Sequence, residues 1–203
     1  MYSRKAILPD AENLRRLITD YSADGTLLPR SLPEICENIR DFTVVVEGDE
    51  FLGCGALHLY GTHLAEIRTI AVWPRFKGTG AGRLLVDALL EEAEQHHVHC
   101  VCLFTRIPEF FAHLGFAEAR REELPDKIYK DCANCPKLHE CDEVAMYRGE
   151  LPQFAILPRP AKLQLRLAQA LVKPTLIDPA PNPTLSPTPL QPSLAPPLVK
   201  LQK

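Results

Sequence analysis

A strand, a glycine-rich loop and a helix follow one another over residues 64–86, and this stretch constrains the fold more than any other part of the chain. Apolar residues run to Val72, Pro74 ends the predicted strand, and glycines at positions 78, 80 and 82 precede a helical pattern that begins at Arg83. Alternate glycines let the main chain approach a ligand closely, and the N-terminus of the helix adds a partial positive charge. The stretch therefore predicts a phosphate-binding loop.

The spacing within this loop separates three phosphate-binding motifs. A Walker loop requires Gly-Lys-Ser/Thr four residues after its first glycine, and a dinucleotide fingerprint requires Gly-x-Gly-x-x-Gly; neither spacing is present. The loop instead fits Gln/Arg-x-x-Gly-x-Gly/Ala, with Lys77, Gly80 and Gly82, and so resembles the pyrophosphate loop of the GNAT superfamily of N-acetyltransferases. An ordinary flexible connection is the alternative. The resemblance implies acetyl-CoA as co-substrate, bound by Ile70, Ala71, Val72, Lys77, Gly78, Thr79, Gly80, Ala81, Gly82 and Arg83.

Sequence periodicity predicts the remaining elements. Apolar residues at helical spacing predict a first helix that is capped by Asp10 and closes near Gly25, and a capping box that starts at Ser31 begins a second helix. Further helices are predicted over residues 83–96 and 109–114. Strands are predicted at residues 42–47, 50–60, 64–72, 98–105, 116–124 and 144–150. The first two strands form a hairpin in which Gly53 and Gly55 indicate a bulge or a close backbone approach.

The strand at 64–72, the helix after it and the strand at 98–105 form a crossover, which is right-handed in nearly all proteins and makes the two strands parallel. The order of the elements up to residue 150 also resembles that of GNAT enzymes. The resemblance implies an α/β fold, in which a mixed, mostly antiparallel sheet is splayed between two parallel central strands and flanked by helices. CoA is expected between these two strands.

Within that superfamily the chain is most similar to the short bacterial N-acetylglutamate synthases, the amino-acid N-acetyltransferases of arginine biosynthesis. Four segments carry this narrower resemblance, namely residues 25–31, 65–68, 105–106 before a Phe-Phe pair, and the cysteine-rich segment 127–146. It implies acetyl transfer to the α-amino group of L-glutamate. Arginine binds carboxylates bidentately and stays charged, and the positions that match are Arg30 and Arg106, with Arg68 and Lys130 as lesser candidates. A solvated surface arginine is the alternative for each.

The resemblance also implies that Glu66, in an Ala-Glu-Ile pattern, is the catalytic base. A base is needed because an α-amino group titrates at about pH 8 or above and is mostly protonated at neutrality. The alternative is a carboxylate paired with Arg68, two residues on along the same strand face. Backbone N–H groups near residues 70–72 are placed to polarise the acetyl carbonyl. Phe111 stands where most of these enzymes have a tyrosine general acid, and Tyr129 is a weaker candidate for that role.

Four metal-ligand side chains cluster in the cysteine-rich segment, in the pattern C-x2-C-x3-H-x-C formed by Cys132, Cys135, His139 and Cys141. Three thiols and an imidazole satisfy a tetrahedral zinc ion, and a reducing compartment favours metal over disulfide. The spacing is tight and no second ligand pair accompanies it, so reduced free thiols are the alternative to a structural zinc. The chain has seven cysteines, an odd number that argues against a disulfide framework.

Charge and composition exclude several classes of partner. The formal net charge is −3 with both signs interspersed, so the chain has no basic footprint for nucleic acid or for an anionic membrane. No apolar run is long enough to span a membrane and no signal-peptide pattern is present, which predicts a cytoplasmic protein. After residue 150 the chain holds 12 of its 19 prolines. We therefore expect a single domain over residues 1–150 and a proline-rich disordered tail over 151–203, with an isolated helix at 162–172 as one feature of it.

Several questions stay open on sequence alone. The acceptor amine could be another amino acid, a peptide N-terminus or a lysine, and a non-catalytic acyl-CoA sensor is an alternative from a different functional class. The tail could dock on proline-binding partners. The resemblance leaves a homodimer as an alternative to a monomer.

Overall fold

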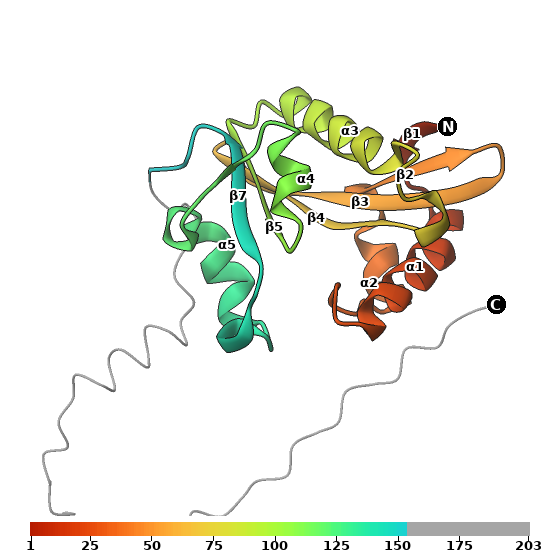
Figure 1. Cartoon of the computed structure of the whole chain (residues 1–203), viewed down its shortest axis with the longest axis horizontal. Coiled ribbons are helices and arrows are strands. Elements are labelled where there is room, and N and C mark those ends of the chain that lie inside the picture. Colours follow the sequence, from red (N-terminus) through yellow and green to blue (C-terminus); the bar gives the residue numbers. More distant parts are fainter. Residues whose placement is uncertain (154–203) are drawn as a thin grey trace, which may run out of the picture. The chain divides into compact units, whose positions relative to one another are not determined.

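The computed structural model describes residues 1–153, which form a sheet of seven strands with helices on both faces (Figure 1). The strands lie in the order β1-β2-β3-β4-β5-β7-β6, and only β4 and β5 are parallel neighbours. They are β1 (Tyr2–Lys5), β2 (Phe42–Glu47), β3 (Glu50–Gly61), β4 (Leu64–Val72), β5 (Cys100–Thr105), β6 (Ala117–Glu118) and β7 (Val144–Gly149). The predicted mixed, mostly antiparallel sheet is confirmed.

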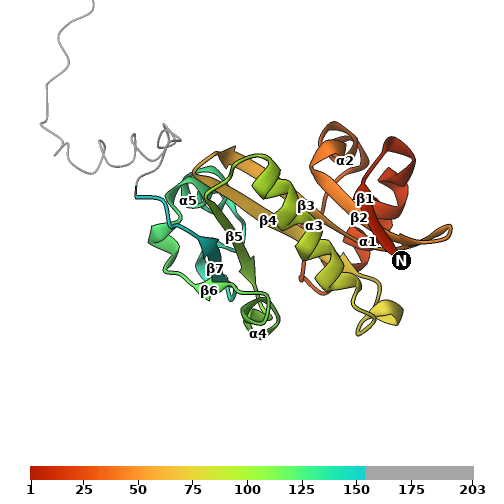
Figure 2. The same cartoon turned by 90° about the horizontal axis from the view of Figure 1, so that it is seen from above.

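The helices are α1 (Ala11–Ala23), α2 (Leu32–Glu37), α3 (Ala81–Gln95), α4 (Pro108–Ala112) and α5 (Pro125–Lys130). Side chains alternate between the two faces of each strand, so each strand supplies both cores. On β4, Ala65 and Ile67 pack with α3, whereas Leu64 packs with Leu124, the residue before α5. Helices α1 and α2 pack on the face opposite α3, as Figures 1 and 2 show. The side chains of Glu66 and Arg68, which share a strand face with Leu64, therefore lie on the face that carries α1, α2 and α5.

Strands β4 and β5 separate soon after they meet. They pair only at Ala65 with Val101 and at Glu66 with Cys102 in the described part of the chain. Beyond Glu66, β4 continues against β3 alone, and β5 continues against β7 up to Thr105. This divergence confirms the predicted splay, and it places Glu66 at the point where the two strands part.

A bulge in β4 lies just beyond this point. Opposite the single residue Gly55 of β3, β4 has two residues, Thr69 and Ile70. Thr69 has a φ of 56°, which costs a β-branched residue about 1–3 kcal/mol. A Cβ on Gly53 would lie 2.6 Å from the carbonyl oxygen of Ala71, so the predicted close backbone approach is confirmed at Gly53. A Cβ on Gly55, opposite the bulge, would lie 2.9 Å from Leu89 Cδ1 of α3. The extra residue increases the local twist of β4 on the side where it leaves β5.

The two predicted helix caps and the strand predicted at 116–124 agree only in part with the structure. Ser31 Oγ accepts the N–H of Glu34 at 3.3 Å, but the Glu34 carboxylate binds Arg30 instead of completing the capping box. Asp10 does not cap α1 with its side chain, because its carboxylate accepts two hydrogen bonds from Arg4. The strand predicted at 116–124 is reduced to the two residues of β6, followed by a 3-10 turn.

Two elements escaped prediction, β1 and α5. With four and six residues respectively, they are too short to show a clear period. The helix predicted from residue 83 begins two residues earlier, and the strand predicted from residue 98 begins two residues later. The predicted helix at 162–172 and nearly all of the proline-rich tail lie outside the described residues. Among the described residues, no helix is long and apolar enough to cross a membrane.

Candidate active site

The glycine-rich loop leads directly into α3. Gly78 and Gly80 have φ values of 82° and 93°, in the left-handed region that favours glycine. Gly80 is the N-cap residue of α3 and provides no side chain to cap it, and its carbonyl accepts the N–H of Leu84 at 3.0 Å. The N–H groups of residues 81–83 lie in the first helical turn, where they have no partner within the helix. This arrangement can accept an anionic group such as a pyrophosphate.

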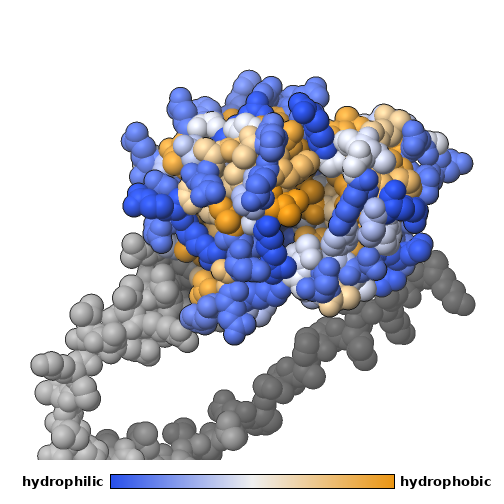
Figure 3. Space-filling view, viewed as in Figure 1, coloured by the Kyte–Doolittle hydropathy of each residue, from blue (hydrophilic) through white to orange (hydrophobic). Residues whose placement is uncertain are grey.

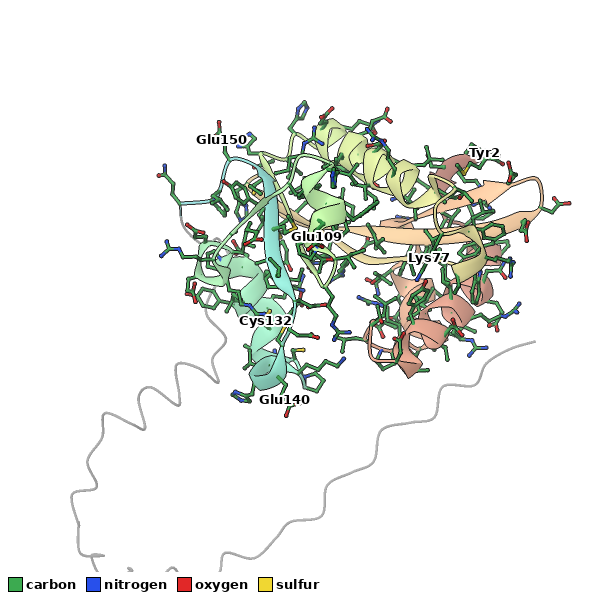
Figure 4. The ribbon with its side chains drawn as sticks, in the orientation of Figure 1. Tyr2, Lys77, Glu109, Cys132, Glu140 and Glu150 are labelled. Carbon is green, nitrogen blue, oxygen red and sulfur yellow. The ribbon has the colours of Figure 1, made fainter. Side chains whose placement is uncertain are left out.

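The loop and the end of β4 are held against α1. Tyr21 donates its hydroxyl hydrogen to the carbonyl of Val72 at 2.6 Å, and Lys77 Nζ lies 5.3 Å from the centre of the same ring. Figure 4 labels Lys77 in this loop. The CoA-binding residues predicted in β4 and in the loop therefore lie on adjoining elements beside the splay. Figure 3 shows apolar residues gathered near the centre of the molecular surface that is seen in the orientation of Figure 1.

Glu66 belongs to a closed ring of four polar side chains. Its Oε1 lies 2.7 Å from Lys127 Nζ and its Oε2 lies 2.9 Å from Tyr60 Oη. Asp131 Oδ2 completes the ring, at 3.0 Å from Tyr60 Oη and 3.2 Å from Lys127 Nζ. The alternative that Glu66 pairs with Arg68 is wrong, because Arg68 is 3.6 Å from Asp131 instead. Glu66 is thus a buried carboxylate whose two oxygens contact an ammonium and a phenol.

The opposite charges in the ring shift the pKa values of Lys127 and Asp131 so that each group keeps its charge. Burial lowers the pKa of Lys127, but the nearby Glu66 and Asp131 carboxylates outweigh it and raise that pKa overall. Burial raises the pKa of Asp131, yet Lys127 and the Tyr60 hydroxyl lower it below its ordinary value. The pKa of Tyr60 is raised by burial and by both carboxylates. The ring therefore holds a cationic Lys127, an anionic Asp131 and a neutral Tyr60.

Next to the ring, two basic side chains meet one imidazole. Arg68 Nη2 lies 2.9 Å from His58 Nδ1, and Lys130 Nζ lies 2.6 Å from His58 Nε2. A neutral imidazole has only one nitrogen that accepts a hydrogen bond, so the group has more donors than acceptors. Two carboxylates border this group, because Asp41 lies 3.7 Å from His58 Nδ1 and Asp131 lies 3.6 Å from Arg68. Arg68 and Lys130, the lesser candidates for substrate binding, therefore belong to a mixed cluster of charges next to the predicted base.

Arg106 lies where three segments that are distant in sequence meet. Arg106 Nη1 donates to the carbonyl of Gly25 at 3.0 Å, and Lys137 Nζ binds the same oxygen at 2.5 Å. Arg106 also pairs with Asp142 at 2.8 Å. In the segment that begins at Gly25, Arg30 pairs with Glu34 at 2.6 Å. Residues 25–31, 105–106 and 127–146, which sequence analysis selected separately, are thus in direct contact.

The proposed zinc ligands do not form a metal site in the described structure. Within residues 1–153, no group of three or more His, Cys, Asp or Glu side chains is arranged to hold a metal ion. All three thiols of this segment are free, and burial raises the pKa of Cys132 to about 11. Cys132, labelled in Figure 4, begins a 3-10 turn that follows α5 after one intervening residue. The described structure thus shows free thiols in this segment and does not bring three or more of the proposed ligands together.

Sequence analysis did not identify three members of the ring, which are Tyr60, Lys127 and Asp131. One signal was present, since Lys127 and Asp131 are four residues apart and would share a helix face. The helix itself was not predicted, so the four-residue spacing could not be used to place the two side chains together. Tyr60 could have been placed on the strand face of His58, which pairs opposite Glu66 in the β3–β4 register.

Comparison with known proteins identifies the family. The model of the acetyltransferase (GNAT) family matches residues 12–116. An uncharacterized N-acetyltransferase of Chlorobaculum tepidum is 40% identical over 145 residues, which cover 71% of this chain and 94% of the relative. A Mycobacterium tuberculosis protein named amino-acid acetyltransferase is 34% identical over 131 residues, 63% of this chain and 75% of the relative.

Solved structures agree with this relationship. A Mycobacterium tuberculosis protein in complex with CoA superposes with a TM-score of 0.65 at 28% identity, over 74% of this chain and 100% of that chain. N-acetylglutamate synthase of Neisseria gonorrhoeae, complexed with CoA and N-acetyl-glutamate, gives a TM-score of 0.66 at 25% identity, over 72% of this chain and 34% of that chain. The splayed sheet, the glycine loop at the start of α3 and these similarities together show that the chain is an N-acetyltransferase that belongs to the GNAT family.

Proposed function

We propose that this enzyme transfers the acetyl group of acetyl-CoA to the α-amino group of L-glutamate and so serves arginine biosynthesis. The observation that carries the proposal is the meeting of Arg106 and the segment containing Arg30 at the Gly25 carbonyl. These are the positions that the resemblance assigns to substrate carboxylates. The proposal is supported by relatives named amino-acid acetyltransferase and by the likeness to an N-acetylglutamate synthase.

Both arginines are paired with carboxylates of the chain itself. Arg30 binds Glu34 and Arg106 binds Asp142, at 2.6 and 2.8 Å. Their exposed side-chain fractions are 20% and 33%, so each remains accessible from solvent. On this proposal, the two carboxylates of glutamate displace these partners, and Arg68 with Lys130 forms a further donor group closer to the base.

The chemistry proposed for Glu66 follows from its position. It lies where β4 leaves β5, and the open edge of β4 beyond it is where the acetyl group is expected to lie. Glu66 would take the proton from the bound ammonium, and the neutral amine would then attack the acetyl carbonyl. Backbone N–H groups near residues 70–72 would stabilise the oxyanion. CoA leaves as a thiolate, whose conjugate thiol has a pKa of about 8.5, so a dedicated general acid is dispensable.

An assay of thiol release from acetyl-CoA across free amino acids tests the acceptor. Glutamate should give the highest kcat/KM, and aspartate, glutamine and lysine should be weaker because each lacks the length or the second carboxylate. N-terminal peptides serve as the competing class. If a peptide or lysine is acetylated more efficiently than glutamate, the acceptor assignment is wrong, whereas the GNAT activity stands. If no amine promotes thiol release, a CoA-binding sensor is the better description.

Removal of either arginine should raise the KM for glutamate. A lost charged hydrogen-bond pair removes about 1.5–3 kcal/mol, so Arg30→Ala and Arg106→Ala should each raise it by about 10- to 100-fold. The KM for acetyl-CoA should change little, because the pyrophosphate loop is formed by other residues. Steady-state kinetics with both substrates varied provides the measurement. Arg15→Ala is the matched control, since Arg15 pairs with Glu12 at 2.6 Å on the surface of α1. An unchanged glutamate KM in both variants would refute the role of the pair.

A further inference from the structure

The ring around Glu66 has one hydrogen too few for its contacts. Tyr60 Oη faces Glu66 Oε2 and Asp131 Oδ2 at 2.9 and 3.0 Å. A phenol carries a single hydrogen, and an ionised carboxylate can only accept. When both carboxylates are ionised, Tyr60 therefore donates to one of them and turns its lone pairs toward the other. A proton added to Glu66 would satisfy both contacts, because Glu66 could donate to Tyr60 while Tyr60 donates to Asp131.

The two carboxylates differ in their access to water. The side chain of Glu66 is 3% exposed, whereas that of Asp131 is 30% exposed. Lys127, which contacts both, is 14% exposed and remains a cation, so it cannot take up a further proton. A proton that reaches Glu66 thus has no direct contact with bulk solvent. The Tyr60 hydroxyl is the group that joins the buried carboxylate to the exposed one.

We propose that Tyr60 and Asp131 form a proton relay that returns Glu66 to its ionised state after each turnover. The inference rests on the proposed role of Glu66 as base, and it does not depend on which amine is the acceptor. The ammonium N–H bond breaks, its electron pair stays on nitrogen, and an O–H bond forms on Glu66 Oε2. This hydrogen moves to Tyr60 Oη as the hydrogen of Tyr60 moves to Asp131 Oδ2. Asp131 then releases a proton to water, and one proton has passed from the amine to solvent.

The surroundings of the ring suit this transfer. Tyr60 is neutral before and after the step, in agreement with burial and two adjacent carboxylates raising its pKa. Asp131 does not retain the proton, because Lys127, the Tyr60 hydroxyl and Arg68 lower its pKa despite its burial. Lys127 sits between the carboxylates and holds their oxygens in place through contacts of 2.7 and 3.2 Å. It is therefore a positioning residue, whereas Tyr60 and Asp131 carry the proton.

Tyr60→Phe tests the relay with little risk to the fold, since it removes one oxygen and keeps the ring. With the best acceptor amine, kcat should fall about tenfold, while the KM for acetyl-CoA is unchanged. Because proton release then limits turnover, kcat should gain a larger solvent deuterium isotope effect and should rise with the concentration of imidazole buffer. Asp131→Asn should behave in the same way, and Asp131→Glu should recover part of the rate. Tyr147→Phe, on β7, is the matched control and should show none of these effects.

These measurements distinguish a proton relay from a purely structural role of Tyr60. They also test the relay independently of which amine is the acceptor. A fall in kcat without buffer rescue and without a change in isotope effect would mean that Tyr60 only orients Glu66, and would overturn the relay. An unchanged kcat in Tyr60→Phe would overturn it as well. Failure of glutamate as the acceptor would show in the amino-acid assay of the unmodified enzyme. The relay can still be measured there with whichever amine is turned over.

Discussion

Gly82→Val is expected to reduce the affinity for CoA by at least about 100-fold while leaving the fold intact. Gly82 is the second residue of α3, in the turn whose N–H groups are proposed to bind the pyrophosphate. An added Cβ would be 3.5 Å from Phe110 Cζ, an ordinary contact distance, so the protein itself has room for a side chain. A valine would instead occupy the space beside the main chain that a phosphate needs. Glycine is also a poorer helix former than valine, so no loss of helix stability is expected.

Calorimetric titration of CoA, together with the thermal unfolding midpoint, measures both parts of this prediction. Ala88→Val, two turns further along the same helix, adds bulk to a half-buried position outside the first turn and should bind CoA normally. Gly80→Val should also abolish binding, but Gly80 has a φ of 93° and strain will contribute to its effect. Gly82 is therefore the cleaner position. Normal CoA affinity in a folded Gly82→Val variant would show that the pyrophosphate lies elsewhere.

The strand, loop and helix at residues 64–86 could be predicted because each carries its own local signal. The apolar run of β4, the glycines before α3 and the apolar face of α3 all involve neighbours in sequence. The hairpin of β2 and β3 was predictable for the same reason, through the turn at Gly48. The parallel pairing of β4 and β5 then followed from the handedness of crossovers. The separation of β4 from β5 was predicted only from the resemblance to known acetyltransferases, because no local sequence pattern indicates it.

The ring around Glu66 could not be predicted, because its members come from positions 60, 66, 127 and 131. Strand alternation correctly put Arg68 on the face of Glu66, but the alternative in which the two side chains pair was wrong. Arg68 lies 3.6 Å from Asp131, and Glu66 is paired with Lys127 at 2.7 Å. Such a choice depends on where α5 packs, and six residues give too short a period to place it.

The cysteine-rich segment shows a related limit. Its ligand spacing suggested a zinc site, but its described contacts are those of a connector between two parts of the site. Asp131, at one end, contacts Arg68 and Tyr60, while Lys137 and Asp142 contact Gly25 and Arg106. Polar residues next to the cysteines thus contact both the ring around Glu66 and the Arg106 region. The sequence pattern pointed to the thiols as functional groups, whereas the described contacts with the rest of the site are made by the charged residues next to them.

Glu66→Gln should lower kcat by about 10²- to 10⁴-fold at neutral pH, which is the range that a general base contributes. Glutamine has nearly the shape of glutamate, and its amide oxygen can still accept from Lys127 while its amide N–H donates to the Tyr60 oxygen. It cannot take a proton from the bound ammonium. Glu92→Gln is the matched control, because Glu92 pairs with Lys5 at 2.7 Å between α3 and β1, away from the site. This control should keep full activity.

The pH dependence of the Glu66→Gln defect distinguishes a base from a residue that only shapes the site. Without a base, the reaction relies on amine that has already lost its proton, a fraction that grows about tenfold per pH unit below the pKa of the amine, which is about 8 or above. The ratio of wild-type to Glu66→Gln kcat should therefore shrink as the pH rises from about 7 toward 9.5. A ratio that stays constant across this range would mean that Glu66 supports the fold of the site, and the base would have to be sought among other groups.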